Sequence, residues 1–407
     1  IKSSAASDVY KRQDKSGRTF NNPYQYFFEQ MHMDDAIYAD ESIYEYPMQQ
    51  GGGNDGRPYS FGRPSSGGSK AAYPCKSYGQ GRINPAYFYG VFDPNDMRRD
   101  VSITMTGSNG KGVEKLIPFV PNSKAEGGGL TLNKWDENRQ ANPWVAAQRK
   151  SGINGPYMRM SEVYLGYAEV CAALGDVVTG KQYLKTVRER SFPQGLANTD
   201  AFIASFGNDL VRAIIEERGF EYAGEGDRRW TLIRSGYLPE DIKRIKDMTK
   251  AMMDGLATKG YYEFENGNII SAYIWTKLVD AKTIYGHRLT AQCPTDKVND
   301  PVLYPGWRGQ KDNWEEMGLN YGSSTPATNL AIKGLFEIVS EEEAASLESQ
   351  GYTKVNWGID LVDNRDEYDK YLFWDYDYVS APIYLWPFTP NVMAAGGFTN
   401  GYGFKQE

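Results

Sequence analysis

The sequence has 407 residues and a formal net charge of −7 at pH 7, with 40% hydrophobic and 24% charged residues. These values are typical of a folded chain and exclude a disordered one. Aromatic residues make up 14% of the chain, led by 30 tyrosines. Because tyrosine combines an apolar ring with a polar hydroxyl, this excess favours ring-lined surfaces in addition to a packed core.

Several classes of protein are excluded by what the sequence lacks. Lys and Arg do not cluster among aromatic residues, so a nucleic-acid partner is not expected. The three cysteines, Cys75, Cys171 and Cys293, lie far apart without a Cys-x-x-Cys pair, which argues against a disulfide framework and a zinc site. No run of 18 apolar residues occurs, so no segment is expected to cross a bilayer as a helix.

The first residues differ in character from the rest. Residues 1–13 (IKSSAASDVYKRQ) resemble a translated adapter of the kind left on assembled sequence reads, and we expect them to be non-native. In that case the native N-terminus is absent, and a missing signal peptide carries no information about location.

Residues 14–155 are predicted to be loop-rich and aromatic-rich. The Gly and Pro content of residues 51–68 excludes a helix or a central strand there. Residues 22–44 are compatible with one helix. Residues 82–107 predict short aromatic-rich strands around a turn at residues 93–96. Long loops inside a compact protein are usually functional, so we expect this region to form the ligand side.

The most regular stretch predicts a pair of helices between Pro156 and Arg190. Apolar residues at steps of three and four give the first helix one apolar face. Gly175 and Asp176 end it, and a second helix runs from about residue 180 until Pro193. The apolar face consists of Tyr157, Met160, Tyr164, Tyr167, Cys171 and Leu174.

This pair also fits the 34-residue tetratricopeptide template, with Ala168 and Gly180 as the small residues between the helices. One such unit does not bury its own apolar face and needs neighbours stacked on it. A third helix is predicted at residues 200–223. Its buried side would consist of Phe202, Phe206, Leu210, Ala213 and Ile214.

Residues 216–236 form a dense group of charges. They allow two interpretations, an acid/base pair or an Arg–carboxylate network that fastens the helix end. The balanced charges, without an accompanying nucleophile, histidine or metal set, favour the network. Glu217, Glu221 and Glu225 are expected to face Arg218, Arg228, Arg229 and Arg234.

Four segments together resemble the SusD/RagB family of nutrient-binding surface lipoproteins of Bacteroidota. Residues 159–175 are similar to its RYAEVLLMYAEAL helix, 183–190 to LNxVRxRAG, 217–236 to ERxxELxxEGxRxxDLxRWG, and 384–404 to its closing motif. Thr231 departs from the usual acidic residue. The matching charged positions, which the resemblance identifies as structural, are Arg159, Glu217, Arg218, Glu221, Glu225, Arg228 and Arg234.

The resemblance implies a mainly α-helical fold with tetratricopeptide-type helix pairs, long loop-rich excursions and a few short strands. The helical core would comprise residues 156–236, between the region 14–155 and a C-terminal part, 237–407. It also implies a non-catalytic protein on the outer face of the outer membrane, held by an N-terminal lipid anchor that this chain lacks. Its partner would be a SusC-like TonB-dependent transporter, and its ligands oligosaccharides for import.

Aromatic rings in Gly/Pro-rich segments are the candidates for contact with such a ligand. A flat ring covers the C–H face of a sugar, while polar side chains satisfy its hydroxyls. Trp135 and Trp374 are weaker candidates. The main candidates form two groups, Arg57, Tyr59, Phe61, Tyr73 and Tyr78, and then Trp307, Arg308, Asn313 and Trp314.

Other functions have weaker support. Asp375 and Asp377 suggest a glycosidase pair, but nothing in the sequence would separate their pKa values, and His32 and His287 belong to no catalytic signature. Oxygen ligands for calcium are abundant, but no EF-hand pattern occurs, so no cofactor is predicted. Two alternatives remain open: a peptide-binding member of the same family, and a helical-repeat scaffold that binds proteins through a polar concave face.

Overall fold

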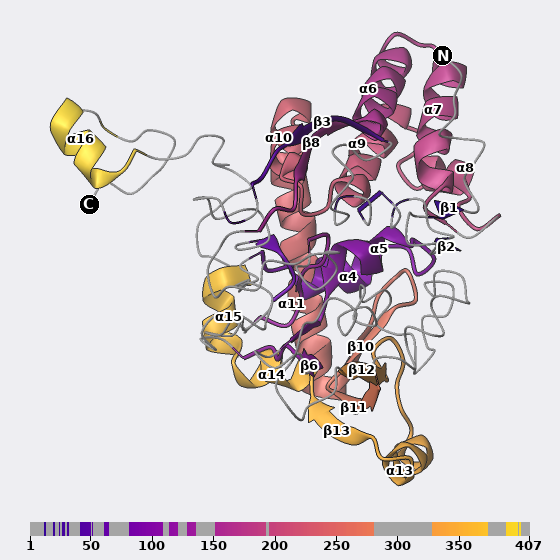
Figure 1. Ribbon diagram of the computed structural model, residues 1–407, viewed down its shortest axis with the longest axis vertical. Helices are drawn as coiled ribbons and strands as arrows, with labels where there is room; N and C mark the ends of the chain where they lie inside the picture. The colour runs from indigo at the N-terminus through magenta and orange to yellow at the C-terminus, as the bar shows by residue number, and fades with distance from the viewer. Residues whose placement is uncertain are drawn as a thin grey trace.

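The structure is a computed structural model, and its described part is mainly helical with short antiparallel strands, as predicted (Figure 1). The described residues are 12, 13, 19, 20, 24, 27, 28, 31, 41–49, 51, 61–64, 81–108, 114–120, 128–135, 151–192, 195–280, 328–372, 388–397 and 399.

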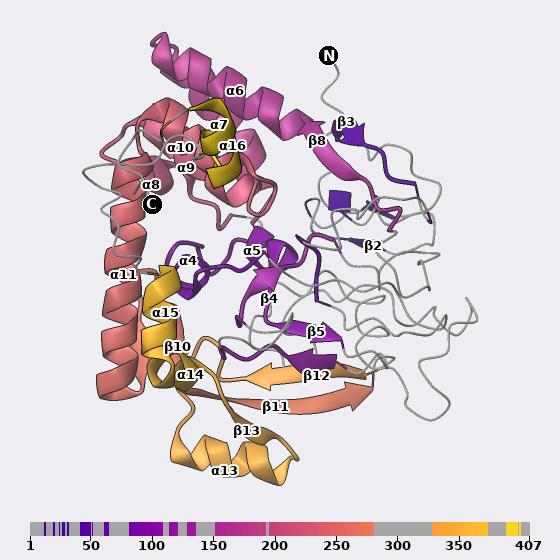
Figure 2. The same ribbon diagram turned by 90° about the vertical axis from the view of Figure 1, so that its left-hand side faces the viewer.

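Six consecutive helices form one end and one side of the molecule, and the longest of them, α11, runs along the side (Figure 2). They are α6 (Met160–Ala173), α7 (Val177–Glu189), α8 (Thr199–Ala204), α9 (Leu210–Glu221), α10 (Asp227–Ser235) and α11 (Leu238–Lys259).

The predicted hairpin of α6 and α7 is confirmed at its turn and its crossing. Gly175 has a φ of +88°, and the side chain of Asp176 accepts a hydrogen bond of 3.1 Å from the backbone N–H of Thr179. A Cβ at Gly180 would lie 3.0 Å from the carbonyl oxygen of Ala168. A side chain at residue 180 would therefore crowd this crossing of the two helices, which favours glycine.

Three predictions about these helices are wrong. The first helix begins at Met160, because residues 155–159 form a strand, and its buried side chains include Leu165, Ala168 and Cys171. Tyr167 and Leu174 of the predicted buried face are exposed. The single helix predicted at 200–223 is two helices, because Gly207 and Asn208 both adopt left-handed φ values of +65°.

The region around residues 82–107 is partly helical. The predicted turn at Asp93 is present, since its side chain accepts a 2.8 Å hydrogen bond from the backbone of Asn95. Residues 85–90 are not a strand. Pro85 starts helix α4 (Pro85–Gly90) and the Asn84 side chain caps it by accepting a 2.8 Å hydrogen bond from Ala86. Helix α5 (Arg98–Ser102) follows the turn.

Every strand pair is antiparallel within the described residues. One three-stranded sheet has the order β12-β11-β13, with β11 (Tyr273–Asp280) in the centre between β12 (Thr328–Lys333) and β13 (Thr353–Asn356). The two-stranded pairs are β1 (Arg12–Gln13) with β2 (Thr19–Phe20), β3 (Ser42–Tyr46) with β8 (Gly155–Arg159), β4 (Ile103–Thr104) with β7 (Thr131–Leu132), β5 (Thr106–Ser108) with β6 (Glu114–Leu116), and β9 (Tyr261–Glu263) with β10 (Ile269–Ser271). Four later helices are α13 (Glu341–Ser349), α14 (Gly358–Asp363), α15 (Arg365–Leu372) and α16 (Pro390–Gly396).

The largest hydrophobic cluster combines residues of all three predicted regions. Phe88, Phe220 and Trp357 belong to it. The Trp357 indole donates a 2.8 Å hydrogen bond to the hydroxyl of Tyr89. The three regions therefore share a core, and their boundaries stay predictions. Trp135 is fully buried in another cluster, so its assignment as a weaker ligand candidate is wrong.

Candidate functional site

Most of the predicted ligand residues lie outside the described residues. Phe61 is the exception. Its side chain is half exposed, and it precedes the buried Arg63, whose backbone N–H donates a 2.8 Å hydrogen bond to the carbonyl of Trp135. A ring at the surface is thus attached to a fixed segment. The candidates outside the described residues are Arg57, Tyr59, Tyr73, Tyr78, Trp307, Arg308, Asn313 and Trp314, together with Trp374 and the pair Asp375 and Asp377.

The second group of candidates lies, in the sequence, between two described strands. Residues 281–327 connect β11 to β12, and the last residue of β11, Asp280, is the register partner of the first residue of β12, Thr328. The two strands that flank Trp307 and Trp314 in the sequence are therefore neighbours in the three-stranded sheet.

A cluster of exposed rings lies elsewhere, on the paired strands β3 and β8, which we call the tyrosine ribbon. Tyr157 is 71% exposed, Tyr46 53% and Tyr44 50%. The rings of Tyr44 and Tyr157 meet edge to face, with centroids 5.7 Å apart and an interplanar angle of 85°. Ile43 and Met158 extend the exposed face. The ribbon thus presents an aromatic surface that the sequence interpretation did not predict.

Irregular pairing explains why so many apolar side chains of the ribbon point outward. The register shifts twice, between Ser42 and Tyr44 and between Tyr44 and Glu45. In a regular strand successive side chains alternate between faces, whereas a bulge redirects the side chain of the extra residue. As a result, Ile43 and Tyr44 are both exposed on β3, and Tyr157 and Met158 on β8.

The charged side chains of the ribbon point inward. Glu45 is buried and accepts a 2.9 Å hydrogen bond from the side chain of Asn154. Arg159, at the end of β8, is also buried. Its guanidinium donates to the Ser161 hydroxyl at 2.8 Å and to a Glu225 carboxylate oxygen at 2.9 Å. The inner side of the ribbon is therefore fixed to the body of the protein by polar contacts.

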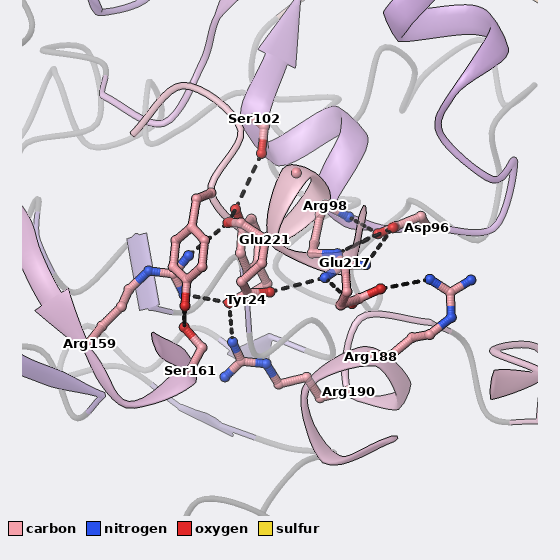
Figure 3. A network of polar contacts seen from close by, with 12 residues as sticks. Tyr24, Asp96, Arg98, Ser102, Arg159, Ser161, Arg188, Arg190, Glu217 and Glu221 are labelled. Atoms are coloured by element: carbon pink, nitrogen blue, oxygen red, sulfur yellow. Dashed lines mark hydrogen bonds and ion pairs between the residues drawn. The ribbon is translucent and has the colours of Figure 1, made fainter. Parts of the chain in front are cut away.

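Arg159 belongs to a buried network centred on Glu221 in α9 (Figure 3). The Glu221 carboxylate accepts hydrogen bonds from Arg159 at 2.5 Å, from Arg98 at 3.1 Å, and from Arg190. Burial raises the pKa of this carboxyl, but the guanidiniums of Arg190, Arg159 and Arg98 outweigh burial and hold the pKa below its usual range. Glu41, which precedes β3, pairs with Arg190 at 2.5 Å. Glu221 thus connects segments that are far apart in sequence.

Glu217, one helical turn before Glu221, extends the network in the other direction. Its two carboxylate oxygens accept hydrogen bonds from Arg98 at 2.6 Å and from Arg188 at 2.9 Å (Figure 3). Arg98 also pairs with Asp96 at 2.7 Å. All four side chains are nearly inaccessible to solvent.

Glu225 forms a third part of the network with Lys134, whose ammonium lies 2.6 Å from the carboxylate. Burial lowers the pKa of Lys134 to about 8, against the raising effect of Glu225. The ammonium also faces the rings of Tyr24 and Phe28, with the nitrogen 5.2 and 4.9 Å from their centroids.

The structural network is therefore built differently from the predicted one. The carboxylates Glu217, Glu221 and Glu225 pair with cations from other segments, not with the arginines nearest in sequence. Thr231, in the position of the usual acidic residue, accepts a 3.1 Å hydrogen bond from Arg218 beside Asp227. The pairs of the motif arginines are Arg218–Asp227, Arg228–Glu216, Arg228–Asp241 and Arg234–Glu169.

These contacts indicate that the network stabilises the fold and does not transfer protons. A carboxylate whose pKa is lowered by three guanidiniums is a poor proton donor near neutral pH, and its oxygens are already bound. Within the described ranges, no three His, Cys, Asp or Glu side chains lie together in a way that could hold a metal ion. None of the helices that the structure describes combines the length and apolar character needed to cross a membrane.

Comparison with known proteins identifies relatives. The model of the SusD family matches residues 3–305. The SusD-like protein P25 of Formosa agariphila is 28% identical over 160 residues, which are 39% of this chain and 26% of that protein. A SusD homolog from Bacteroides thetaiotaomicron is similar with a TM-score of 0.42 and 19% identity, over 57% of this chain and 49% of the other. The surface glycan-binding protein A of the same species, solved with laminarihexaose, has a TM-score of 0.38 and 18% identity, over 53% and 47%. The matches thus span less than half the length of these relatives.

Proposed function

Because the chain belongs to the SusD family, we propose that it is a non-catalytic surface protein of the outer membrane that captures oligosaccharides for import. The observation that carries this proposal is the exposure of tyrosine rings, including Tyr44 and Tyr157, over a frame whose charged groups are paired inside. Exposed aromatic rings with polar hydroxyls suit the C–H faces and hydroxyl rims of sugars. The frame supplies rigidity, and its paired carboxylates are not arranged for hydrolysis.

Binding without turnover is the first expected result. Polysaccharides polymerised into a native gel should retard the protein, and incubation with the same polysaccharides should release no new reducing ends. Replacing Trp307 or Trp314 with alanine should weaken this retardation, because each stacked ring contributes about 1 kcal/mol, with little change in melting temperature.

A casein digest serves as the comparison ligand. Binding of its peptides without any retardation by polysaccharides would replace the saccharide proposal with the peptide-binding alternative. New reducing ends that disappear in the Asp375→Asn variant would make the protein an enzyme.

The proposed partner is a TonB-dependent transporter, and α6 offers a surface for it. Val163, Tyr167, Val170 and Leu174 follow helical spacing along one face, and all are exposed, Leu174 by 82%. Val178, at the start of α7, lies exposed beyond the turn. A contiguous apolar stripe of this kind is typical of a protein interface.

Charge on this stripe should prevent docking. The Val170→Glu/Leu174→Glu double variant should fail to co-purify with the transporter but keep its polysaccharide binding and its melting temperature, because both side chains are exposed. Glu189→Lys, an exposed charge change on α7, is the control. Undiminished co-purification of the double variant would remove the stripe from the interface.

A further inference from the structure

We infer that the outer face of the tyrosine ribbon binds an uncharged saccharide and discriminates against acidic ones, an inference that rests on the proposed function. The face consists of Ile43, Tyr44, Tyr46, Tyr157 and Met158.

The rings of this face are pre-organised. Tyr44 and Tyr157 come from different strands and hold each other edge to face, with centroids 5.7 Å apart. Tyr44 is the register partner of Met158, the residue that follows Tyr157 on β8. A ligand that stacks on rings already fixed in place loses less conformational entropy than one that must order them.

The two register shifts coincide with consecutive exposed side chains on each strand. A regular two-stranded ribbon would turn Tyr157 and Met158 to opposite sides, because successive side chains alternate. Here both are exposed. Bulges recur where a strand must redirect a side chain, commonly beside functional sites. The ring contact between Tyr44 and Tyr157 places these two exposed side chains on the same side of the ribbon.

The charges of the ribbon determine which saccharide fits. Within β3 and β8 the ionisable side chains other than tyrosine are Glu45 and Arg159, and both are buried. The guanidinium of Arg159 is already bound to Glu221 and Glu225. A carboxylate or sulfate on a sugar would thus lose hydration at this face without gaining a cation from the ribbon. The net charge of −7 also repels acidic polymers at low ionic strength.

Tyrosine hydroxyls supply the complementary polar groups. Each both donates and accepts a hydrogen bond, which matches the hydroxyl rim of a neutral sugar. Tyr46, two residues after Tyr44 on β3 and 53% exposed, adds a third hydroxyl. Ring faces and hydroxyls without exposed ions are therefore the recognition chemistry of this surface.

The test compares neutral and acidic polymers on the same gels. The probes are the neutral glucans amylopectin, laminarin and pullulan and the acidic polygalacturonate. We expect retardation by at least one neutral glucan and not by polygalacturonate. Tyr157→Ala should weaken the affinity for that glucan about fivefold to tenfold, and Tyr44→Ala similarly, because each removes one stacking ring and frees the other. Tyr157→Phe, which keeps the ring, should retain most of the affinity.

Trp230→Ala is the matched control, since the Trp230 side chain is also about half exposed, at 54%, but lies on α10. It should bind like the wild type, and thermal melts should show every variant folded. Retardation by polygalacturonate, or unchanged binding of a neutral glucan by Tyr157→Ala and Tyr44→Ala, overturns this inference and leaves the proposed function standing. No retardation by any of the four polymers overturns both.

Discussion

Replacing Glu221 with alanine should lower the free energy of unfolding by about 3–5 kcal/mol, because the change leaves guanidiniums buried without their partner. Arg98, Arg159 and Arg190 all donate to this carboxylate, and the carboxylate itself is inaccessible to solvent. The remaining carboxylates are already engaged by other cations. Urea unfolding followed by tryptophan fluorescence measures the change.

The control is a surface pair of the same chemistry. Glu169 pairs with Arg234, whose side chain is almost half exposed, so Glu169→Ala should cost less than about 1 kcal/mol. If Glu221→Ala costs no more than Glu169→Ala, the buried network does not hold the segments together.

The same substitution should act on the ribbon at a distance. Arg159 ends β8 and is the register partner of Ser42 in β3, so its side chain fixes the inner side of the ribbon. Without Glu221, this arginine keeps Glu225 and Glu41 but loses its shortest contact. Saccharide affinity should therefore fall in Glu221→Ala although residue 221 is buried and touches no ligand.

The sequence predicted the hairpin well but not the side that it buries. Gly175, Asp176 and Gly180 are local signals, because a left-handed turn, a cap and a close crossing each favour a small set of residues. Helix α6, however, carries apolar or small residues on two sides. Leu165 is buried and Tyr167 is exposed, and only the position of α7 and α9 decides between them.

The sequence predicted an Arg–carboxylate network, but it assigned the wrong arginines to the carboxylates. The motif supplies Glu221 and Arg159, but the assumption that charges pair with near neighbours in sequence fails for a helix that packs in the interior. Arg98 lies 123 residues before Glu221 and still contacts it. Such pairing depends on tertiary packing, which a single sequence does not specify.

The sequence did not predict the tyrosine ribbon, because its two strands lack the alternation of apolar and polar residues that is typical of a half-buried strand. Tyr44 fell within a predicted helix and Tyr157 on the apolar face of another. A regular strand is recognised by alternating apolar and polar residues. The register shifts at Tyr44 interrupt this alternation in both strands. The sequence did offer one signal of a strand: Tyr44 and Tyr46 lie two residues apart, on either side of Glu45.

Acid should destabilise the protein through the same buried carboxylates. The pKa values of Glu221, Glu41 and Asp241 are lowered in the fold, because the arginines beside them outweigh the opposing effect of burial. In the unfolded chain these groups titrate near pH 4. Below about pH 5 the unfolded state therefore binds protons that the folded state does not, and the free energy of unfolding falls as the pH falls. At pH 3, Glu221 alone should account for a loss of about 2 kcal/mol relative to pH 6.

Urea unfolding at pH 6 and at pH 3 tests this contribution. Glu221→Gln removes the titrating group, so it should be less stable than the wild type at pH 6 but lose about 2 kcal/mol less between the two values. Glu169→Gln, in the exposed pair with Arg234, is the control for the loss of a surface carboxylate. Lys134 changes the free energy of unfolding in the same direction, but at higher pH. Its pKa of about 8 in the fold lies below that of an unfolded lysine, so its contribution to stability rises with pH between about 8 and 10.4. An acid loss that is identical in Glu221→Gln and the wild type would mean that Glu221 is not held ionised by its arginines.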